Sequence, residues 1–386
     1  MTGPARSPAP GHRYAALDAL RGICALCVCL FHFQAAGPIA TSAFVRGSWL
    51  FVDFFFVLSG FVMACSWGNR LVDVRAGKRF ALLRLGRVYP LHIVVLLAFL
   101  GTELAGAALA SPDLMQRDAF DAERSVEAWV LSAAFLQIFG LLPGLSWNPP
   151  SWSIAAEFWT YLVFAGLMIV GRRRAGLLLA ITAGVSVAVL ALVAPEGINA
   201  TFDFSLWRCL FGFCFGALIW RWTVNGRVPV GGTLAELVLV ALVIAFVSLG
   251  GGGAPANLLA PLLFGLTVHV FAAQTGWVSQ LLLHPQLQQL GVWSYSIYMV
   301  HAFVQSRMDD VLRVAAKLGG PTLVSAQAIG GRSLDVMGTT PAMGVLLTIV
   351  MLLLVIATAA FTWRFVEMPG QRWASRRAAR LDQAPS

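Results

Sequence analysis

Apolar stretches of about twenty residues recur along the chain, and this repetition limits its fold more than any other sequence feature. A helix needs about 20 mostly apolar residues to cross the hydrocarbon core of a bilayer. The stretches that approach this length are residues 15–35, 49–66, 88–108, 128–142, 152–170, 176–194, 204–222, 234–250, 257–274, 290–307 and 342–363. The sequence therefore predicts an all-α, polytopic transmembrane helix bundle that forms a single unit.

The scarcity of charge supports this prediction. A soluble globular domain carries about 25% charged residues to cover its surface, whereas this chain of 386 residues carries 12%, with 58% hydrophobic residues. Much of its surface must therefore face lipid. The net charge of +9 does not indicate a nucleic-acid partner, because the basic residues lie between the apolar stretches, where they orient a membrane protein.

The positive-inside rule decides how many stretches span the membrane. If all eleven span, the arginine triplet 172–174 lies outside, against the rule. The weakest candidate is 128–142, which is short and closed by Pro143 and Gly144, so the segment near 128–143 is predicted to be re-entrant or interfacial. About ten spans remain, with both termini cytoplasmic.

The predicted organisation is a cytoplasmic tail (1–13), a transmembrane domain (14–369) and a basic cytoplasmic tail (370–386). The N-terminal tail lacks a small-residue cleavage site after the first apolar stretch, so it is not interpreted as a signal peptide. The six cysteines all lie in apolar stretches, and no CxxC motif is followed by a second one further along the chain. They predict packing positions rather than disulfides or a metal site.

Ionisable side chains inside spans are costly and mark functional sites. Arg21 and His32 in the first span are eleven residues apart, about 16 Å along one helix face. Asp18 precedes Arg21 by three residues and offers Arg21 a purely structural role as an ion-pair partner. For His32, the structural alternative is a satisfied packing residue.

Two clusters of polar residues are predicted from the depth of each residue in its span. The outer cluster contains His32, Asp53, Ser153, Glu157 and His301. A carboxylate beside a histidine raises its basicity and fixes its tautomer, and the sequence leaves open which carboxylate does so.

The inner cluster contains Arg21, Arg84 and Arg87. Two arginines one helical turn apart can bind phosphate groups bidentately. The alternative is that Arg84 and Arg87 only anchor a helix end.

These segments, taken in order, resemble the acyltransferase-3 family of bacterial integral-membrane acyltransferases. The resemblance covers Tyr14 to Pro369 and rests on six motifs in the family's order. They are the arginine and histidine of LDALRGICALCVCLFHF (Arg21 to His32), FFFVLSGFVMA (54–64), RLGRVYPLH (84–92), PPSWSIAAEFWTYL (149–162), SYSIYMVH (294–301) and RFVEMP (364–369). Ala155 and Ala156 depart from the commoner residues before Glu157, which affects the match little.

The resemblance implies a ten-helix core and an enzyme that transfers an acetyl or other short acyl group from acyl-CoA to a hydroxyl of a sugar, polysaccharide or lipid-linked glycan. Acyl-CoA would be a co-substrate, with no permanently bound cofactor. The implied location is the bacterial inner membrane. The resemblance leaves open whether a partner protein completes transfer to an extracytoplasmic acceptor.

The site residues follow from these arguments together. The catalytic candidates are His32 as general base or transient acyl carrier, Glu157, and Arg21 near the thioester oxyanion. The donor-binding candidates are Arg84, Arg87 and Ser59. The remaining candidates are Asp53, Trp152, Ser153, Tyr298, His301 and Glu367. The rival hypothesis is a secondary transporter, because intramembrane Arg, His and Glu also mark ion paths, but no inverted repeat or pair of broken spans is visible.

Overall fold

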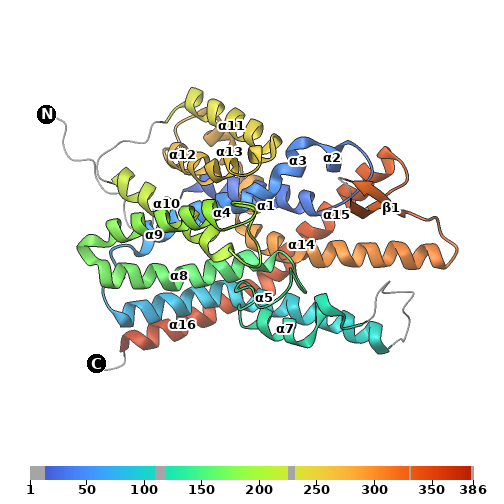
Figure 1. Cartoon of the computed structure of the whole chain (residues 1–386), viewed down its shortest axis with the longest axis horizontal. Coiled ribbons are helices and arrows are strands. Elements are labelled where there is room, and N and C mark those ends of the chain that lie inside the picture. The colour runs from blue at the N-terminus through green and yellow to red at the C-terminus, as the bar shows by residue number, and fades with distance from the viewer. Residues whose placement is uncertain (1–13, 109–118, 225–230, 330–331, 384–386) are drawn as a thin grey trace.

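The computed structural model describes residues 14–108, 119–224, 231–329 and 332–383. The predicted N-terminal tail lies outside these ranges. The longer helices are α1 (Ala15–His32), α4 (Phe51–Trp67), α5 (Val74–Ala108), α8 (Ser151–Gly171), α9 (Ala175–Leu192), α10 (Ser205–Val224), α11 (Thr233–Ser248), α12 (Ala260–Ala272), α14 (Pro285–Lys317), α15 (Pro341–Thr362) and α16 (Met368–Gln383). They form the predicted all-α bundle (Figure 1).

Five helical stretches of the described residues are long and apolar enough to cross a bilayer. They are Ala15–His32, Ala43–Trp67, Val74–Ala108, Ser151–Leu192 and Pro341–Leu381. Three of them join consecutive helices: α3 (Ala43–Gly47) with α4, α8 with α9, and α15 with α16. The chain is thus a helical membrane protein, while the count of ten spans stays a prediction.

The segment predicted not to span is short in the structure. Within 128–142, helical structure is confined to α7 (Val126–Ala133), which is eight residues long, or about 12 Å. The chain then runs in turns to Pro150. The segment is tied to its neighbours because Trp159 donates a hydrogen bond to the Phe135 carbonyl at 2.9 Å. An eight-residue helix cannot cross a bilayer, as expected.

Small residues let the central helices touch backbone to backbone. A Cβ atom at Gly22 of α1 would lie 2.5 Å from the Leu290 carbonyl carbon of α14, and one at Gly291 would lie 2.3 Å from the Asp18 oxygen. Between α4 and α10, a Cβ at Gly60 would lie 1.8 Å from the Phe213 oxygen. Close packing of this kind holds membrane helices together, and it brings α1 and α14 within reach of each other's polar side chains.

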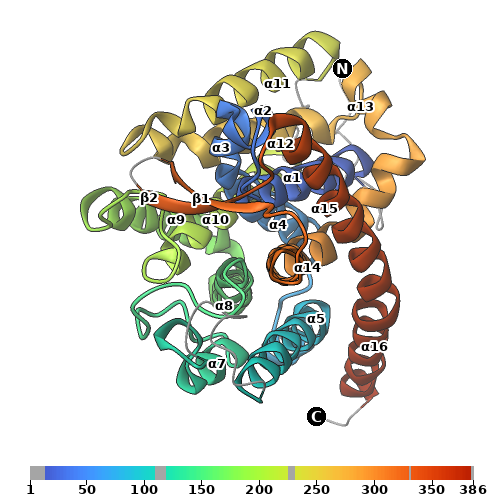
Figure 2. The same ribbon diagram turned by 90° about the vertical axis from the view of Figure 1, so that its right-hand side faces the viewer.

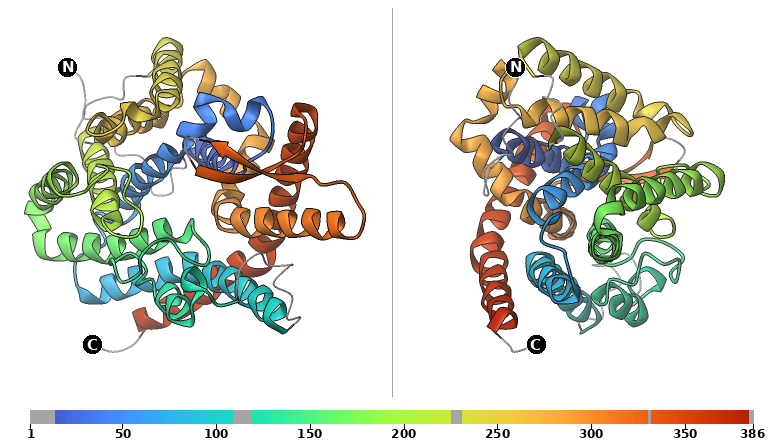
Figure 3. Two further views of the ribbon diagram at one scale, coloured as in Figure 1. Left: turned by 45° about the vertical axis from the view of Figure 1, so that its right-hand side comes forward. Right: turned by 90° about the vertical axis from the view of Figure 1, so that its left-hand side faces the viewer.

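Helix α14 lies near the middle of the bundle. Figure 2 looks along the bundle from the end that carries the strands, and it shows α14 end-on with α5 and α8 to one side. Figure 3 shows α16 on the outside of the bundle beside α5. Helix α14 is therefore placed to present residues toward α1, α5 and α15 at once.

The helix at the strand end of the bundle is longer than the apolar stretch 290–307 of the sequence. Helix α14 continues to Lys317, so Arg307 and Arg313 lie on this helix. A hairpin of β1 (Val324–Ile329) and β2 (Arg332–Met337) follows. Met337 donates to the Gln34 carbonyl at 3.0 Å and accepts from the Ala36 amide at 2.8 Å. These bonds attach the hairpin to the chain just after His32.

The arginine-rich helix ends lie at the end of the bundle opposite the β hairpin. Arg75 at the start of α5 donates to the Leu381 carbonyl of α16 at 2.8 Å. A Cβ at Gly77 would lie 2.9 Å from Ile169 of α8, and one at Gly176 of α9 would lie 3.1 Å from Arg221. One end of the bundle thus carries the arginine-rich helix ends, in agreement with the charge asymmetry of the sequence.

Candidate active site

A central cavity of about 370 Å³ lies among α1, α4, α5, α8, α14 and α16. It combines apolar walls with many polar side chains, as ligand sites do. The polar lining consists of Arg21, Ser59, Arg84, Arg87, Ser153, Glu157, Tyr161, Ser294, Tyr295, Tyr298 and Gln371. The structure thus brings together all three predicted donor-binding residues and two of the three predicted catalytic residues.

Arg21 is held by α14 as well as by its own helix. Its Nε donates to Ser294 Oγ at 2.8 Å, and its Nη2 donates to the Gly291 carbonyl at 3.1 Å. Asp18 lies 3.3 Å from Nη2, so the expected ion pair is present. Because the guanidinium is fixed on several sides, Arg21 presents a positioned positive charge to the cavity.

Arg84 and Arg87 line the cavity one helical turn apart on α5. Arg87 Nη1 donates to the buried Glu367 carboxylate at 2.5 Å, and Ser296 donates to the same carboxylate at 2.8 Å. Glu367 ends a π-helical turn, Trp363–Glu367, a feature common at functional sites. Arg84 Nε is buried and has no acceptor among the described residues, so part of its donor capacity is available to a ligand.

Glu157 lines this central cavity. The prediction that it belongs to the same cluster as His32 is wrong, because His32 lines a different cavity. The Glu157 carboxylate accepts hydrogen bonds from Ser59 and Tyr161, both at 2.5 Å. The reason is depth: Glu157 is six residues into α8, about 9 Å from the helix start. Sequence spacing alone does not show that this depth coincides with Ser59 of α4.

Asp53 is also separated from His32. It forms a bidentate pair with Arg208 of α10 at 2.9 and 2.7 Å, and both side chains are almost fully buried. The rings of Trp49 and Trp152 lie 5.3 and 5.2 Å from the Arg208 guanidinium. Asp53 therefore belongs to a buried ion pair, and Trp152 packs against that pair, rather than either lining the cavity. Sequence reasoning missed Arg208, although an arginine in the apolar stretch SLWRCLFG was the available signal.

His32 lines a second cavity of about 250 Å³, here called the outer cavity, together with residues of the 123–150 segment and of α14. Its Nδ1 lies 2.9 Å from the Val28 carbonyl. A carbonyl only accepts hydrogen bonds, so in the neutral ring Nδ1 carries the hydrogen and Nε2 keeps its lone pair. The expected orienting carboxylate is thus replaced by a backbone carbonyl of the same helix.

A line of side chains connects the two cavities. Tyr298, which lines the central cavity, shares a 2.8 Å hydrogen bond with Ser153. The Tyr298 ring lies 5.7 Å from that of His301, which in turn lies 5.0 Å from that of His32. Neither nitrogen of His301 makes a well-formed hydrogen bond to a described residue. The predicted candidates Ser153, Tyr298 and His301 therefore lie between the central cavity and His32.

Comparison with known proteins identifies this architecture. Residues 14–364 match the family described as an acyltransferase domain. The chain belongs to the acyltransferase-3 family. It is therefore an acyltransferase in a membrane environment, and the transporter hypothesis is not supported.

Two curated proteins are similar to this acyltransferase. It is 29% identical over 302 residues to the acyltransferase MdmB of Streptomyces mycarofaciens, and the aligned region covers 71% of this chain and 70% of that protein. It is 29% identical over 203 residues to protein 2 in the picA locus of Rhizobium radiobacter, which covers 49% of this chain and 99% of that protein. No solved structure matches the chain.

Proposed function

We propose that this acyltransferase moves an acetyl or other short acyl group from acyl-CoA to a hydroxyl of a saccharide, with His32 as the general base. The observation that carries the proposal is the pairing of an arginine-rich central cavity with an outer cavity that contains His32. Arginines suit the phosphates of CoA, whereas a neutral imidazole with a free Nε2 suits a hydroxyl.

In this reaction, the CoA phosphates bind near Arg84 and Arg87, and the acyl-bearing arm extends through the central cavity toward His32. The acceptor oxygen attacks the thioester carbon, its proton passes to His32 Nε2, and the carbon–sulfur bond breaks. The leaving thiolate then takes up a proton. In the alternative route, His32 Nε2 is first acylated and the acyl group passes to the acceptor in a second step. Rapid denaturation at neutral pH after mixing with labelled acetyl-CoA distinguishes the two routes, because only the second leaves label on the protein and an acyl-imidazole would be lost in acid.

The test of the overall proposal uses the purified chain in lipid nanodiscs with radiolabelled acetyl-CoA. We expect the label to appear in an O-acyl ester of an added saccharide, with release of one CoA thiol for each ester. Release of CoA with free acetate as the acyl product, and no O-acetyl ester of any added saccharide, would contradict the proposal.

The donor site gives a specific prediction. Replacing Arg84 with glutamine should raise the KM for acetyl-CoA by about 10-fold or more, because a hydrogen bond to a charged group contributes about 1.5–3 kcal/mol. The rate at saturating donor should change little, since this end of the donor does not react. Steady-state kinetics with varied acetyl-CoA measures both quantities.

Arg79→Gln is the matched control, because Arg79 precedes Arg84 on α5 and does not line the cavity. The double Arg84→Gln, Arg87→Gln variant should weaken donor binding further. It also leaves buried Glu367 without its cation, so its stability must be measured in parallel. A donor KM that stays at the wild-type value in Arg84→Gln would reduce the pair to helix anchors.

The proposed orientation places the protein in the bacterial inner membrane with both termini and the arginine-rich end in the cytoplasm. Residues 143–151 then face the extracytoplasmic side. A periplasm-active reporter fused at Gly144, beside which the structure has open space, should be active there. The same reporter fused after Gln383 should be inactive. The reverse result would overturn the orientation and the assignment of His32 to the acceptor side.

A further inference from the structure

The outer cavity is lined by polar side chains on part of its surface and by aromatic and proline side chains on the rest. Its polar lining comprises His32, Glu123, Arg124, Ser146, Gln305 and Ser306. Its apolar walls include Phe99, Trp147, Pro149 and Pro150. Its volume of about 250 Å³ falls just below the range of about 300–1,000 Å³ typical of drug-sized ligands. The cavity thus has room for one small ring or for the end of a larger acceptor.

Hydrogen-bond acceptors dominate the part of this lining that is not already paired. His32 presents Nε2, because Nδ1 is engaged by Val28. Gln305 donates its Nε2 to the Cys29 carbonyl at 2.8 Å, which leaves its Oε1 without a partner among the described residues. Gln305 is only 7% exposed, so this acceptor is held within the cavity wall. A site of this kind suits a ligand that donates hydrogen bonds.

Glu123 adds a third acceptor at the cavity rim. Its side chain is exposed and lines the cavity, and no described residue pairs with its carboxylate. A carboxylate can accept from two neighbouring hydroxyls at once, because it has two oxygens with about four lone-pair positions. The rim therefore suits a vicinal diol.

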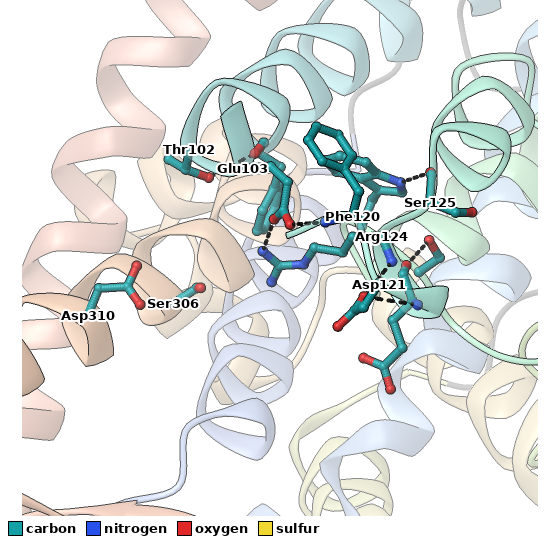
Figure 4. A network of polar contacts seen from close by, with 12 residues as sticks. Thr102, Glu103, Phe120, Asp121, Arg124, Ser125, Ser306 and Asp310 are labelled. Carbon is teal, nitrogen blue, oxygen red and sulfur yellow. Dashed lines mark hydrogen bonds and ion pairs between the residues drawn. The ribbon is translucent and has the colours of Figure 1, made fainter. Parts of the chain in front are cut away.

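The positive charge of Arg124 is already engaged. Figure 4 shows its guanidinium directed toward Glu103, whose carboxylate also accepts from the Phe120 amide. The distance from Arg124 Nη1 to Glu103 Oε2 is 3.3 Å, and the Glu103 side chain is fully buried. Because Glu103 neutralises Arg124, the cavity offers little attraction to an anionic ligand.

The same network shapes the apolar wall. Asp121 accepts hydrogen bonds from the Glu123 and Arg124 amides at 3.1 and 3.0 Å, and Trp147 Nε1 donates to the Ser125 carbonyl at 3.0 Å. Trp147 is thereby fixed against the 120–125 turn. Rigid aromatic and proline surfaces pack against the apolar faces of a ring while polar groups read its edge.

We propose that the outer cavity binds one ring of a neutral saccharide, with its reacting hydroxyl at His32 Nε2, a neighbouring hydroxyl at Gln305 Oε1 and a further diol at Glu123. This inference rests on the proposed function and names the residues that select the acceptor. Gln305 and Glu123 bind and position the sugar, whereas the proton of the reacting hydroxyl passes to His32.

The experiment measures transfer from radiolabelled acetyl-CoA by the full chain in nanodiscs. Three acceptors are compared: methyl glucoside, the anionic methyl glucuronide, and tetrahydropyran-2-methanol, a ring of similar shape with a single hydroxyl. We expect saturable transfer to methyl glucoside, with kcat/KM at least about 10-fold above that of the other two, because sites that hydrogen-bond hydroxyls discriminate strongly against analogues that lack them.

Two variants then locate the discrimination. Gln305→Leu and Glu123→Gln should each raise the KM for methyl glucoside by about 5- to 30-fold, as expected for the loss of one hydrogen bond of about 1–2 kcal/mol. Neither should alter the KM for tetrahydropyran-2-methanol or for acetyl-CoA. Glu127→Gln is the control, since Glu127 is exposed and does not line the cavity. Glu123 is a surface residue, so its variant tests the inference even if Gln305→Leu is unstable.

The outcomes separate this inference from the proposed function. If methyl glucoside shows no saturable transfer while an O-acetyl ester forms on methyl glucuronide, the assignment of a neutral saccharide is overturned and the proposed function stands. The assignment is equally overturned if both variants keep the wild-type KM for methyl glucoside. If the wild-type chain releases no CoA from acetyl-CoA under any condition, the proposed function itself fails.

Discussion

Replacing His32 with alanine is expected to reduce acyl transfer by about 10²–10⁴-fold, the usual contribution of a positioned general base. The structure gives this expectation a geometric basis, because the Val28 carbonyl at 2.9 Å holds Nδ1 and leaves Nε2 to take the proton. The protein should still insert and fold, since the His32 side chain is exposed in the outer cavity. Labelled acetyl transfer in nanodiscs measures activity, and size-exclusion chromatography in detergent measures folding.

His301 provides the control for this prediction. Its ring lies 5.0 Å from that of His32, but it is fully buried and does not line either of the two cavities. We therefore expect His301→Gln to retain more activity than His32→Gln. If the His32 variants transfer at nearly the wild-type rate while the His301 variant is inactive, the general base has been assigned to the wrong histidine.

The second large effect is expected at the Asp53–Arg208 pair. Asp53→Asn should lower the free energy of unfolding by about 3–5 kcal/mol, because it leaves the buried Arg208 cation without its counter-charge. The two side chains are 0% and 1% exposed, so water cannot replace the lost partner. Denaturant unfolding in detergent micelles, followed by tryptophan fluorescence, measures the loss.

Two further variants distinguish stability from chemistry. Replacing both residues with apolar ones, Asp53→Val with Arg208→Met, should recover most of the stability, since apolar substitutes for a buried pair are often neutral. Asp335→Asn removes a carboxylate that is 53% exposed from its pair with Arg313, and should change stability by less than about 1 kcal/mol. If Asp53→Asn unfolds like the wild type but has lost acyl transfer, the pair has a chemical role that this interpretation omits.

The polar partners of two carboxylates explain why these candidate residues were grouped incorrectly. Asp53 and Glu157 were both expected near His32 because all three were placed toward one side of the membrane. In the structure, Asp53 faces Arg208, which lies 155 residues further along the chain, and Glu157 faces Ser59, which lies 98 residues away. Depth along a helix can be estimated from the sequence, but the direction of the side chain depends on which neighbour packs against it.

The 120–125 turn and Gln305 were not recognised at all. Sequence reasoning weighed ionisable groups within apolar spans, where their cost makes them conspicuous. Glu123 and Arg124 lie in a polar connection in which charges are ordinary, and Gln305 carries no charge. Their significance comes from the cavity that they share with His32, and a cavity is a property of several segments together.

The sequence by itself determined the membrane class, the helical fold, the family and the identity of most candidate site residues. These follow from the length of apolar stretches, the distribution of charge and short motifs, which are all properties of neighbouring residues. The tertiary structure alone decided that Arg21 and His32, on one helix, serve two different cavities. It did so because close contacts at Gly22 and Gly291 set the rotation of α1 against α14, which brings Arg21 to Ser294 across 273 residues of chain.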